Sequence, residues 1–318
     1  MNNKEILYII VPCYNEEEVL VDTAKQLSQK LLSLIDSGTV SPDSRVLFVD
    51  DGSKDNTWTL ISGFHGEPDS VISGLRLTAN VGHQNALLAG LFSAAGLCDI
   101  TITIDADLQQ DINAIDSFLE KYFNGNDIVY GVRNTRKADS FFKKASASLF
   151  YNIMKLLGAK VVKNSADYRL LSKKAVLALS HYKESNLFLR GILPLVGYQS
   201  DIVYFDVQKR LAGTSKYTLS KMLSLALNGI TSFSVKPIRA IMMLGMISFL
   251  VSFIIAIVHA ILYFLGHIPT PGLTTIVLSI WALGGLQLVA IGVIGEYIGK
   301  TYIETKERPR YEIWEFLK

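Results

Sequence analysis

Short runs of β-branched and aromatic residues alternate with helical patterns through the first 133 residues of the chain. This alternation predicts strands at residues 6–14, 45–50, 71–78, 100–105 and 127–133. Helices are predicted between them, at residues 16–36, 55–64 and 83–96. Strands that alternate with helices form a sheet whose crossover helices cover both faces. We therefore predict a doubly wound α/β domain, in which ligands bind beyond the carboxyl ends of the strands.

Two long runs without charged residues follow near the C-terminus. Residues 240–266 carry no charge if His259 is neutral, and the second run covers residues 273–295. Each run is long enough to cross about 30 Å of hydrocarbon. The alternative, a helix buried in a protein core, is less consistent with runs of this length. We predict two transmembrane helices, at about 238–265 and 273–298, within a membrane segment at residues 237–299.

Basic residues flank these two runs on one side only. Lys236 and Arg239 precede the first run, and the second is followed by Lys300, Lys306, Arg308 and Arg310. The connecting loop has no Lys or Arg, so the positive-inside rule places both chain ends in the cytoplasm. The sequence thus predicts a multi-pass protein of the plasma membrane. Its domain at residues 1–213 and its tail at residues 300–318 would both be cytosolic.

Two further features concern the membrane. The segment at residues 214–236 has one apolar helical face, which predicts a helix in the membrane interface or, alternatively, an amphipathic helix packed on the domain. Gly292, Gly295 and Gly299 lie close together in the second apolar run. They could form a helix-packing face and support a homo-oligomer, although glycine is also simply tolerated in membrane helices.

Charge and cysteine content argue against a nucleic-acid-binding protein and against a disulfide framework. The net charge of +2 gives no indication of nucleic-acid binding, and only two cysteines are present. Two cysteines form no disulfide framework and are consistent with a reducing, cytosol-facing location.

Two aspartates at alternate positions end the predicted strand at residues 100–105. If the extended path continues, Asp105 and Asp107 point to one face of the sheet, with Gln109 next. Close carboxylates repel each other unless a cation lies between them. Mg²⁺ in proteins is held by one or two carboxylates together with substrate phosphates. The pattern predicts half of a metal site whose other half arrives with a diphosphate; the alternative is a solvated loop.

Neighbouring strand ends carry groups that suit a nucleotide. Asp50 and Asp51 end one predicted strand, and Pro12, Tyr14 and Glu16 end another. A carboxylate can accept a hydrogen bond from a base or ribose, and an aromatic ring can face a base. The Gly-rich motifs of P-loop and dinucleotide-binding proteins are absent from the sequence. A nucleotide diphosphate held by a metal remains consistent with these residues.

Seven short motifs occur in a fixed order along the chain. They are V-P-x-Y-N-E (11–16), V-D-D-G-S-x-D-x-T (49–57), N-x-G (80–82), D-A-D-L-Q (105–109), G-V-R (131–133), A-D-Y-R-L (166–170) and R-x-x-G-x-S-K-Y (210–217). In this order they resemble the family-two glycosyltransferases of GT-A fold. Together with the two apolar runs, the chain is similar over nearly its whole length to the polyprenyl-phosphate glycosyltransferases. That group includes bactoprenol glucosyltransferases and resembles dolichol-phosphate mannose synthases. The chain departs from the family pattern at "QDIN" (110–113) and at His83.

This resemblance implies an activity and a set of site residues. The activity would be transfer of one sugar, with glucose favoured, from a nucleotide-diphosphate sugar, with UDP favoured, to a polyprenyl phosphate such as undecaprenyl phosphate. The product would serve modification of cell-envelope glycans. Asp107 and Asp167 would be catalytic, and Mg²⁺ or Mn²⁺ would be held by Asp105, Asp107 and Gln109. The residues that would bind the nucleotide are Pro12, Tyr14, Glu16, Asp51 and Asp105.

A phosphate acceptor makes specific demands on the site. A phosphate monoester is already anionic at pH 7, so it needs cations rather than a general base. The predicted acceptor-phosphate residues are Arg133, Arg210, Ser215 and Lys216, with Arg136 and Arg169 as further candidates. Arginine offers a bidentate fork to phosphate, whereas any one basic residue could also be a solvated surface charge. Asp167 would then orient the sugar or Arg169 rather than take a proton.

Three other functions are compatible with parts of the sequence. A processive polysaccharide synthase shares the fold but carries a Q-x-x-R-W motif, which this sequence lacks. A non-catalytic membrane scaffold would derive from a decayed transferase domain, yet Asp105, Asp107 and Gln109 are all present. A sugar nucleotidyltransferase would need a Gly-rich N-terminal loop, which is also absent.

Overall fold

The computed structural model describes residues 4–134, 162, 164–184, 189–206, 236–265 and 273–318. The chain divides into two compact units. The first is an α/β unit formed by the N-terminal part of the chain together with residues 308–318, and the second contains two long helices. The chain leaves the first unit before these helices and returns to it after them.

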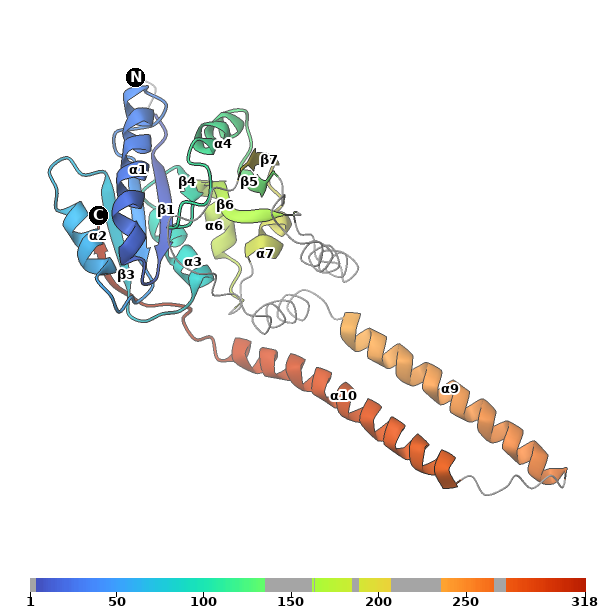
Figure 1. Ribbon diagram of the computed structural model, residues 1–318. Coiled ribbons are helices and arrows are strands. Elements are labelled where there is room, and N and C mark those ends of the chain that lie inside the picture. Colours follow the sequence, from blue (N-terminus) through green and yellow to red (C-terminus); the bar gives the residue numbers. More distant parts are fainter. Residues whose placement is uncertain (1–3, 135–161, 163, 185–188, 207–235, 266–272) are drawn as a thin grey trace. The chain divides into compact units, whose positions relative to one another are not determined.

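One mixed sheet of eight strands forms the centre of the first unit (Figure 1). The strand order is β7-β5-β6-β4-β1-β2-β3-β8. The strands are β1 (Leu7–Cys13), β2 (Arg45–Asp50), β3 (Ile72–Leu77), β4 (Ile100–Thr103), β5 (Ile128–Arg133), β6 (Ser165–Ser172), β7 (Ser200–Phe205) and β8 (Ile313–Leu317). Strand β1 pairs in parallel with β2 and β4, and β2 with β3. Strand β6 is antiparallel to both β4 and β5, and β8 is antiparallel to β3.

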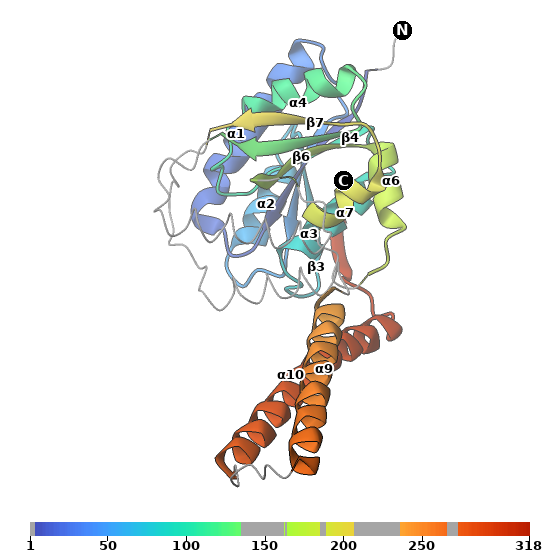
Figure 2. The same cartoon turned by 90° about the vertical axis from the view of Figure 1, so that its right-hand side faces the viewer.

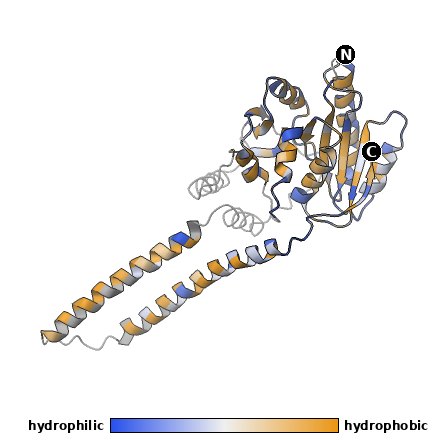
Figure 3. Ribbon diagram, turned by 180° about the vertical axis from the view of Figure 1, so that it is seen from behind, coloured by the Kyte–Doolittle hydropathy of each residue, from blue (hydrophilic) through white to orange (hydrophobic). Residues whose placement is uncertain are grey.

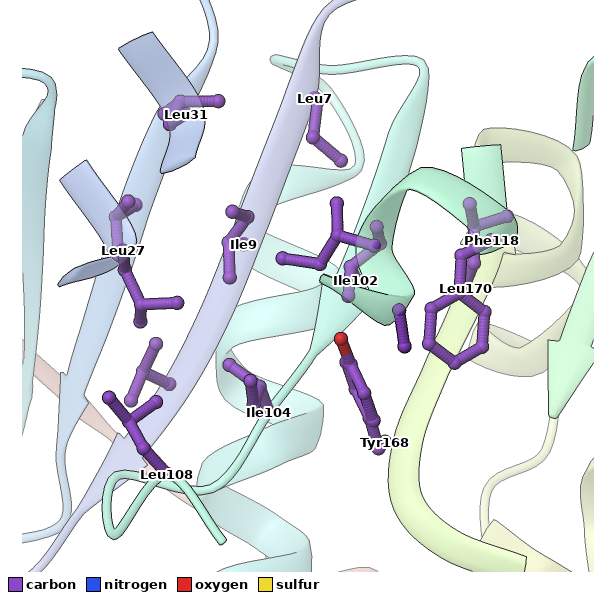
Figure 4. Packing of buried hydrophobic residues seen from close by; sticks show 14 of the residues in the cluster. Leu7, Ile9, Leu27, Leu31, Ile102, Ile104, Leu108, Phe118, Tyr168 and Leu170 are labelled. Atoms are coloured by element: carbon purple, nitrogen blue, oxygen red, sulfur yellow. The ribbon is translucent and has the colours of Figure 1, made fainter. Parts of the chain in front are cut away.

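Helices cover both faces of this sheet (Figure 2). They are α1 (Glu17–Asp36), α2 (Thr57–His65), α3 (His83–Ala94), α4 (Ala114–Phe123), α6 (Lys173–Ser180) and α7 (Leu189–Val196). Leu27 of α1 and Phe118 of α4 belong to one buried cluster with Ile9, Ile102 and Tyr168 of the sheet (Figure 4). Alternate strand residues therefore face this cluster, and their neighbours face α3, α6 and α7. The predicted doubly wound α/β architecture is confirmed.

Strand β8 covers the β3 edge of the sheet. Its register pairs Leu75 with Phe316 and Arg76 with Glu315. The guanidinium carbon of Arg76 lies 5.6 Å from the ring centre of Trp58 and 5.7 Å from that of Trp314. A cation between two aromatic faces stabilises their contact. The predicted C-terminal tail thus contributes a strand to the α/β unit, which sequence analysis did not predict.

The second unit contains α9 (Lys236–Phe264) and α10 (Leu273–Thr305). Both helices predicted from the two uncharged runs are present, and α10 extends beyond the predicted end at 298. Large apolar side chains are exposed along both, among them Met242, Ile254, Ile280 and Leu288. The hydropathy colouring of Figure 3 shows hydrophobic residues along the length of both ribbons. Within the part of the chain that the structure describes, no helix combines the length and apolarity needed to cross a membrane. The interfacial helix predicted at 214–236 lies outside the described residues, apart from Lys236.

Close packing of α3 on the sheet predicts a specific sensitivity to added volume. A Cβ atom at Gly90 would lie 2.4 Å from Cγ2 of Ile10 and 2.8 Å from Cγ2 of Val49. We expect Gly90→Ala to lower the free energy of unfolding by about 1–3 kcal/mol because the core is overpacked. Gly63→Ala is the matched control in α2, since nothing lies within 4 Å of its Cβ position. It should raise stability by up to about 1 kcal/mol in the same urea titration. An unchanged Gly90→Ala variant would contradict the packing.

Candidate active site

The predicted site residues gather at one edge of the sheet. Strands β1, β2 and β4 end there, and β6 begins there because it runs antiparallel to β4. The register pairs Cys13 with Asp50 and Thr103 with Arg169. Polar side chains that follow β1, β2 and β4 are therefore brought to a common edge, as the sequence predicts. Those that open β6 join them, which sequence analysis did not predict.

The two acids that end β2 bind neighbouring backbone. Asp51 is buried and accepts hydrogen bonds from the backbone N–H groups of Val81 (2.7 Å) and Gly82 (3.0 Å). Asp50 is fully buried and accepts one from the N–H of Ser53 at 3.1 Å. Burial raises the pKa of both carboxyl groups. Asp51 therefore holds the loop before α3 in place, and its predicted contact with the nucleotide stays a prediction.

The predicted nucleotide residues of the first motif lie on and after β1. Pro12 is buried within the strand, whereas Tyr14 and Glu16 are half-buried in the loop that follows. This loop is tied to the loop after β2. Asn15 has a positive φ of 52°, and its side chain accepts a hydrogen bond from the N–H of Lys54 at 2.8 Å. The N–H of Glu16 donates to Oγ1 of Thr57 at 3.0 Å. The first two motifs thus form one connected rim.

The two aspartates predicted to bind a metal lie in a turn rather than on a strand. Strand β4 ends at Thr103, and the N–H of Leu108 donates to the carbonyl of Asp105 at 3.3 Å. Leu108 has a φ of 44°, in the left-handed region. The expectation that strand alternation aims Asp105, Asp107 and Gln109 to one face is therefore wrong for this segment. The geometry of the turn, rather than the alternation of a strand, sets the positions of these side chains.

Both carboxylate oxygens of Asp105 have side-chain partners. Nε2 of His83 lies 3.1 Å from one oxygen, and Nε2 of Gln110 donates to the other at 2.5 Å. Desolvation raises the pKa of Asp105, but the contacts with His83 and Gln110 lower it, and the net shift is downward. Desolvation lowers the pKa of His83, but the carboxylates of Asp105 and Asp167 raise it, and the net shift is upward. His83, at a position where the family pattern is often basic, thus supplies a partner for Asp105. Gln110 is a second partner, which was not predicted from the sequence.

Asp107 and Gln109 complete the predicted metal-binding group. The N–H of Gln109 donates to a carboxylate oxygen of Asp107 at 3.2 Å. Among the described residues, no cluster of three or more His, Cys, Asp or Glu side chains is arranged to hold a metal. Mg²⁺ needs fewer protein ligands, because substrate phosphates and water supply the rest. Two carboxylates and an amide oxygen are hard donors, so these residues fit Mg²⁺ or Mn²⁺ that binds together with a diphosphate.

Asp167 is enclosed by two arginines. Its carboxylate pairs with Nη2 of Arg169, which is only 2% exposed. Arg190 of α7 adds a bidentate contact, with Nη2 at 2.7 Å and Nε at 3.3 Å. Desolvation raises the pKa of Asp167, but the charges of Arg190 and Arg169 lower it far more, to well below the usual range for a carboxyl group. Asp167 is therefore ionised at neutral pH and is a weak base.

Arg190 is a site residue that sequence analysis missed. It is the only charged residue in the apolar stretch from 187 to 196, and that isolation was the available signal. Arg133, at the end of β5, is half-buried, and its N–H donates to the carbonyl of Asn164 just before β6. Arg169, a further acceptor candidate, is buried and pairs with Asp167. The remaining predicted acceptor residues lie outside the described residues: Arg136, Arg210, Ser215 and Lys216.

Comparison with known proteins identifies the family. Residues 8–179 match the family described as Glycosyl transferase family 2. Over 311 residues the chain is 50% identical to the uncharacterized glycosyltransferase YkoT of Bacillus subtilis (strain 168), covering 98% of this chain and 92% of that protein. It is 37% identical over 310 residues to the bactoprenol glucosyl transferase of Shigella phage SfV, covering 96% and 97%. It is 38% identical over 312 residues to the prophage bactoprenol glucosyl transferase homolog of Escherichia coli (strain K12), again covering 96% and 97%. The chain, with its mixed GT-A-like sheet, therefore belongs to glycosyltransferase family 2.

Proposed function

We propose that this glycosyltransferase moves one hexose, with glucose favoured, from a UDP-sugar to a polyprenyl phosphate such as undecaprenyl phosphate. The observation that carries the proposal is the pairing of Asp167 with Arg169 and Arg190. A site that surrounds its carboxylate with arginines offers cations rather than a general base. The names of the bactoprenol glucosyl transferase relatives support the same reaction class. A role in cell-envelope glycan modification stays a prediction.

The chemistry of the acceptor explains why no base is needed. A hydroxyl acceptor must lose a proton as it attacks, whereas a phosphate monoester already carries negative charge at pH 7. The phosphate acceptor must instead overcome electrostatic repulsion, because it approaches an anionic donor. Arginine side chains at the edge of the sheet would lower that barrier through charge and bidentate hydrogen bonds. Arg133 is the described candidate, and Arg210, Ser215 and Lys216 are the predicted partners beyond the described residues.

The donor side requires a divalent cation in this proposal. Asp105, Asp107 and Gln109 would hold Mg²⁺ or Mn²⁺, which supplies neutralisation of the charge that develops on the departing nucleotide diphosphate. The chain's own contribution is to orient the carboxylates. His83 and Gln110 direct Asp105, and the backbone of Gln109 directs Asp107. Pro12, Tyr14, Glu16 and Asp51 would line the nucleotide.

The acceptor's location motivates a membrane role. Helices α9 and α10 have 29 and 33 residues, or about 43 and 50 Å at 1.5 Å per residue, more than the roughly 30 Å of a hydrocarbon core. The chain belongs to the first unit before α9 and again, through β8, after α10. This arrangement supports an even number of membrane crossings. We propose a multi-pass protein of the plasma membrane with a cytoplasmic catalytic unit. Association of copies through Gly292, Gly295 and Gly299 stays a prediction.

A donor panel with the full chain in detergent tests the proposed reaction. Labelled glucose from UDP-glucose should pass to undecaprenyl phosphate but not to undecaprenol. Arg133→Ala should raise KM for the lipid phosphate about ten- to a hundredfold, since a charged hydrogen bond is lost, and should leave UDP binding unchanged. Arg45→Ala, at the opposite end of β2, is the matched control and should behave as the wild type.

Other outcomes of the panel would assign other functions. A ladder of repeated sugars would indicate a processive synthase. Binding of metal and nucleotide without turnover, across UDP-glucose, UDP-N-acetylglucosamine, UDP-galactose and GDP-mannose, would favour a scaffold. Transfer that requires a neutral hydroxyl acceptor would contradict the proposal outright.

A further inference from the structure

One short segment contacts three separate parts of the candidate site. We call residues 81–84, at the start of α3, the β3–α3 junction. The backbone N–H groups of Val81 and Gly82 donate to Asp51. The imidazole of His83 contacts Asp105 at 3.1 Å. Oε1 of Gln84 accepts a hydrogen bond from the N–H of Leu189 at 3.2 Å. The last contact leads away from the donor side, to the first residue of α7.

The start of α7 is where Arg190 must be positioned. The first N–H groups of a helix have no partner within the helix, and Gln84 satisfies that of Leu189. A cation in a first turn is disfavoured by the helix dipole, and the two-point contact with Asp167 offsets this for Arg190. Helix α7 has only eight residues and contains Pro194. Short helices rely on tertiary contacts for their stability, so the first turn of α7 needs contacts from outside the helix.

We propose that Gln84 is a positioning residue that acts through α7: it anchors the N–H of Leu189 so that Arg190 keeps its two-point contact with Asp167. Gln84 itself need not touch either substrate. Gln84 thereby links the β3–α3 junction, which contacts Asp51 and Asp105, to Asp167 and its two arginines. The family match ends at residue 179, so Arg190 and α7 lie beyond it. The kinetic test of this role rests on the proposed function.

Turnover by variants at residue 84 provides the first test. Gln84→Ala should lower kcat for transfer about three- to tenfold, as expected for one lost hydrogen bond, and change the affinity for UDP by less than twofold. Gln84→Glu should recover most of the rate, because its carboxylate can accept the same hydrogen bond and is favoured at a helix N-terminus. Gln26→Ala, at an exposed position of α1, is the matched control. Equal rates for wild type and Gln84→Ala would overturn the proposal.

A double-mutant cycle shows whether Gln84 acts through Arg190. In an Arg190→Ala background, adding Gln84→Ala should lower kcat by less than a further twofold. If the two effects multiply in full, Gln84 acts independently of Arg190 and the proposal fails. Arg190→Lys replaces Arg190→Ala in the cycle should the latter not fold.

Hydrogen exchange separates this inference from the proposed function. In the full chain in detergent, Gln84→Ala should speed amide exchange in residues 189–196 at least threefold, and Gln26→Ala should not. Unchanged exchange would overturn the anchoring role even if transfer is confirmed. Faster exchange in a protein that transfers no sugar to a lipid phosphate would support the anchoring and reject the proposed function instead.

Discussion

Replacing Asp107 with alanine should lower sugar transfer at least about a thousandfold while leaving the unfolding curve of the α/β unit unchanged. A bound divalent ion stabilises the transition state by several kcal/mol, and about 4 kcal/mol corresponds to a thousandfold in rate. Asp107 is half-buried in the turn after β4 and is not part of the hydrophobic core. Initial rates of labelled transfer and circular dichroism during urea unfolding measure the two quantities.

The control for this experiment is Asp22→Ala, which removes an exposed carboxylate from α1 and should change neither quantity. Treatment of the wild type with a chelator should abolish transfer, and added Mg²⁺ or Mn²⁺ should restore it. Transfer that resists the chelator would reject the metal assignment. An Asp107→Ala variant with more than a tenth of the wild-type rate would remove Asp107 from the group that holds the metal.

The strands predicted from the sequence are those whose signal is local. The apolar runs at residues 7–13 and 46–49 each lead into a polar turn, and the structure has strands at both. Strand β6 alternates polar and apolar residues from Ser165 to Leu170, a period that does indicate a strand. The pairing of β8 with the edge of the sheet could not be predicted, since its partner β3 lies more than 230 residues earlier in the chain.

Asp105 was predicted at the correct edge because it follows a predicted strand, and the parallel register of β1, β2 and β4 brings such strand ends together. Asp167 was indicated only by a family motif, since β6 was not predicted as a strand. The partners of both acids were not predicted. Their contacts come from helices far away in sequence, namely His83 of α3 and Arg190 of α7. No periodic pattern encodes such pairings. The positive φ of Leu108, which ends the extended path before Gln109, is likewise invisible in a sequence, because leucine rarely adopts it.

The second large effect concerns stability. Asp167→Asn should lower the free energy of unfolding at pH 7 by about 3–5 kcal/mol, because it leaves the buried guanidinium of Arg169 without a counter-charge. Asp167 has a depressed pKa in the folded protein. Its contribution is therefore present above the unfolded-state pKa of about 3.9 and is lost as pH falls from there toward the folded-state pKa. Urea unfolding of the full chain in detergent at pH 7, 5 and 3.5 should show the same difference between wild type and variant at pH 7 and 5, and a difference that begins to narrow at pH 3.5.

Two further variants show whether charge pairing is the cause. Asp107→Asn should unfold as the wild type does, since its carboxylate is not held between buried arginines. Asp167→Asn combined with Arg169→Met should recover much of the lost stability, because an apolar replacement of a buried ion pair is often neutral. An Asp167→Asn variant as stable as the wild type at pH 7 would contradict the arginine pairing. If that stable variant also bound both substrates yet transferred no sugar, Asp167 would act through its charge on the reaction itself, and the base-free mechanism proposed for the phosphate acceptor would be wrong.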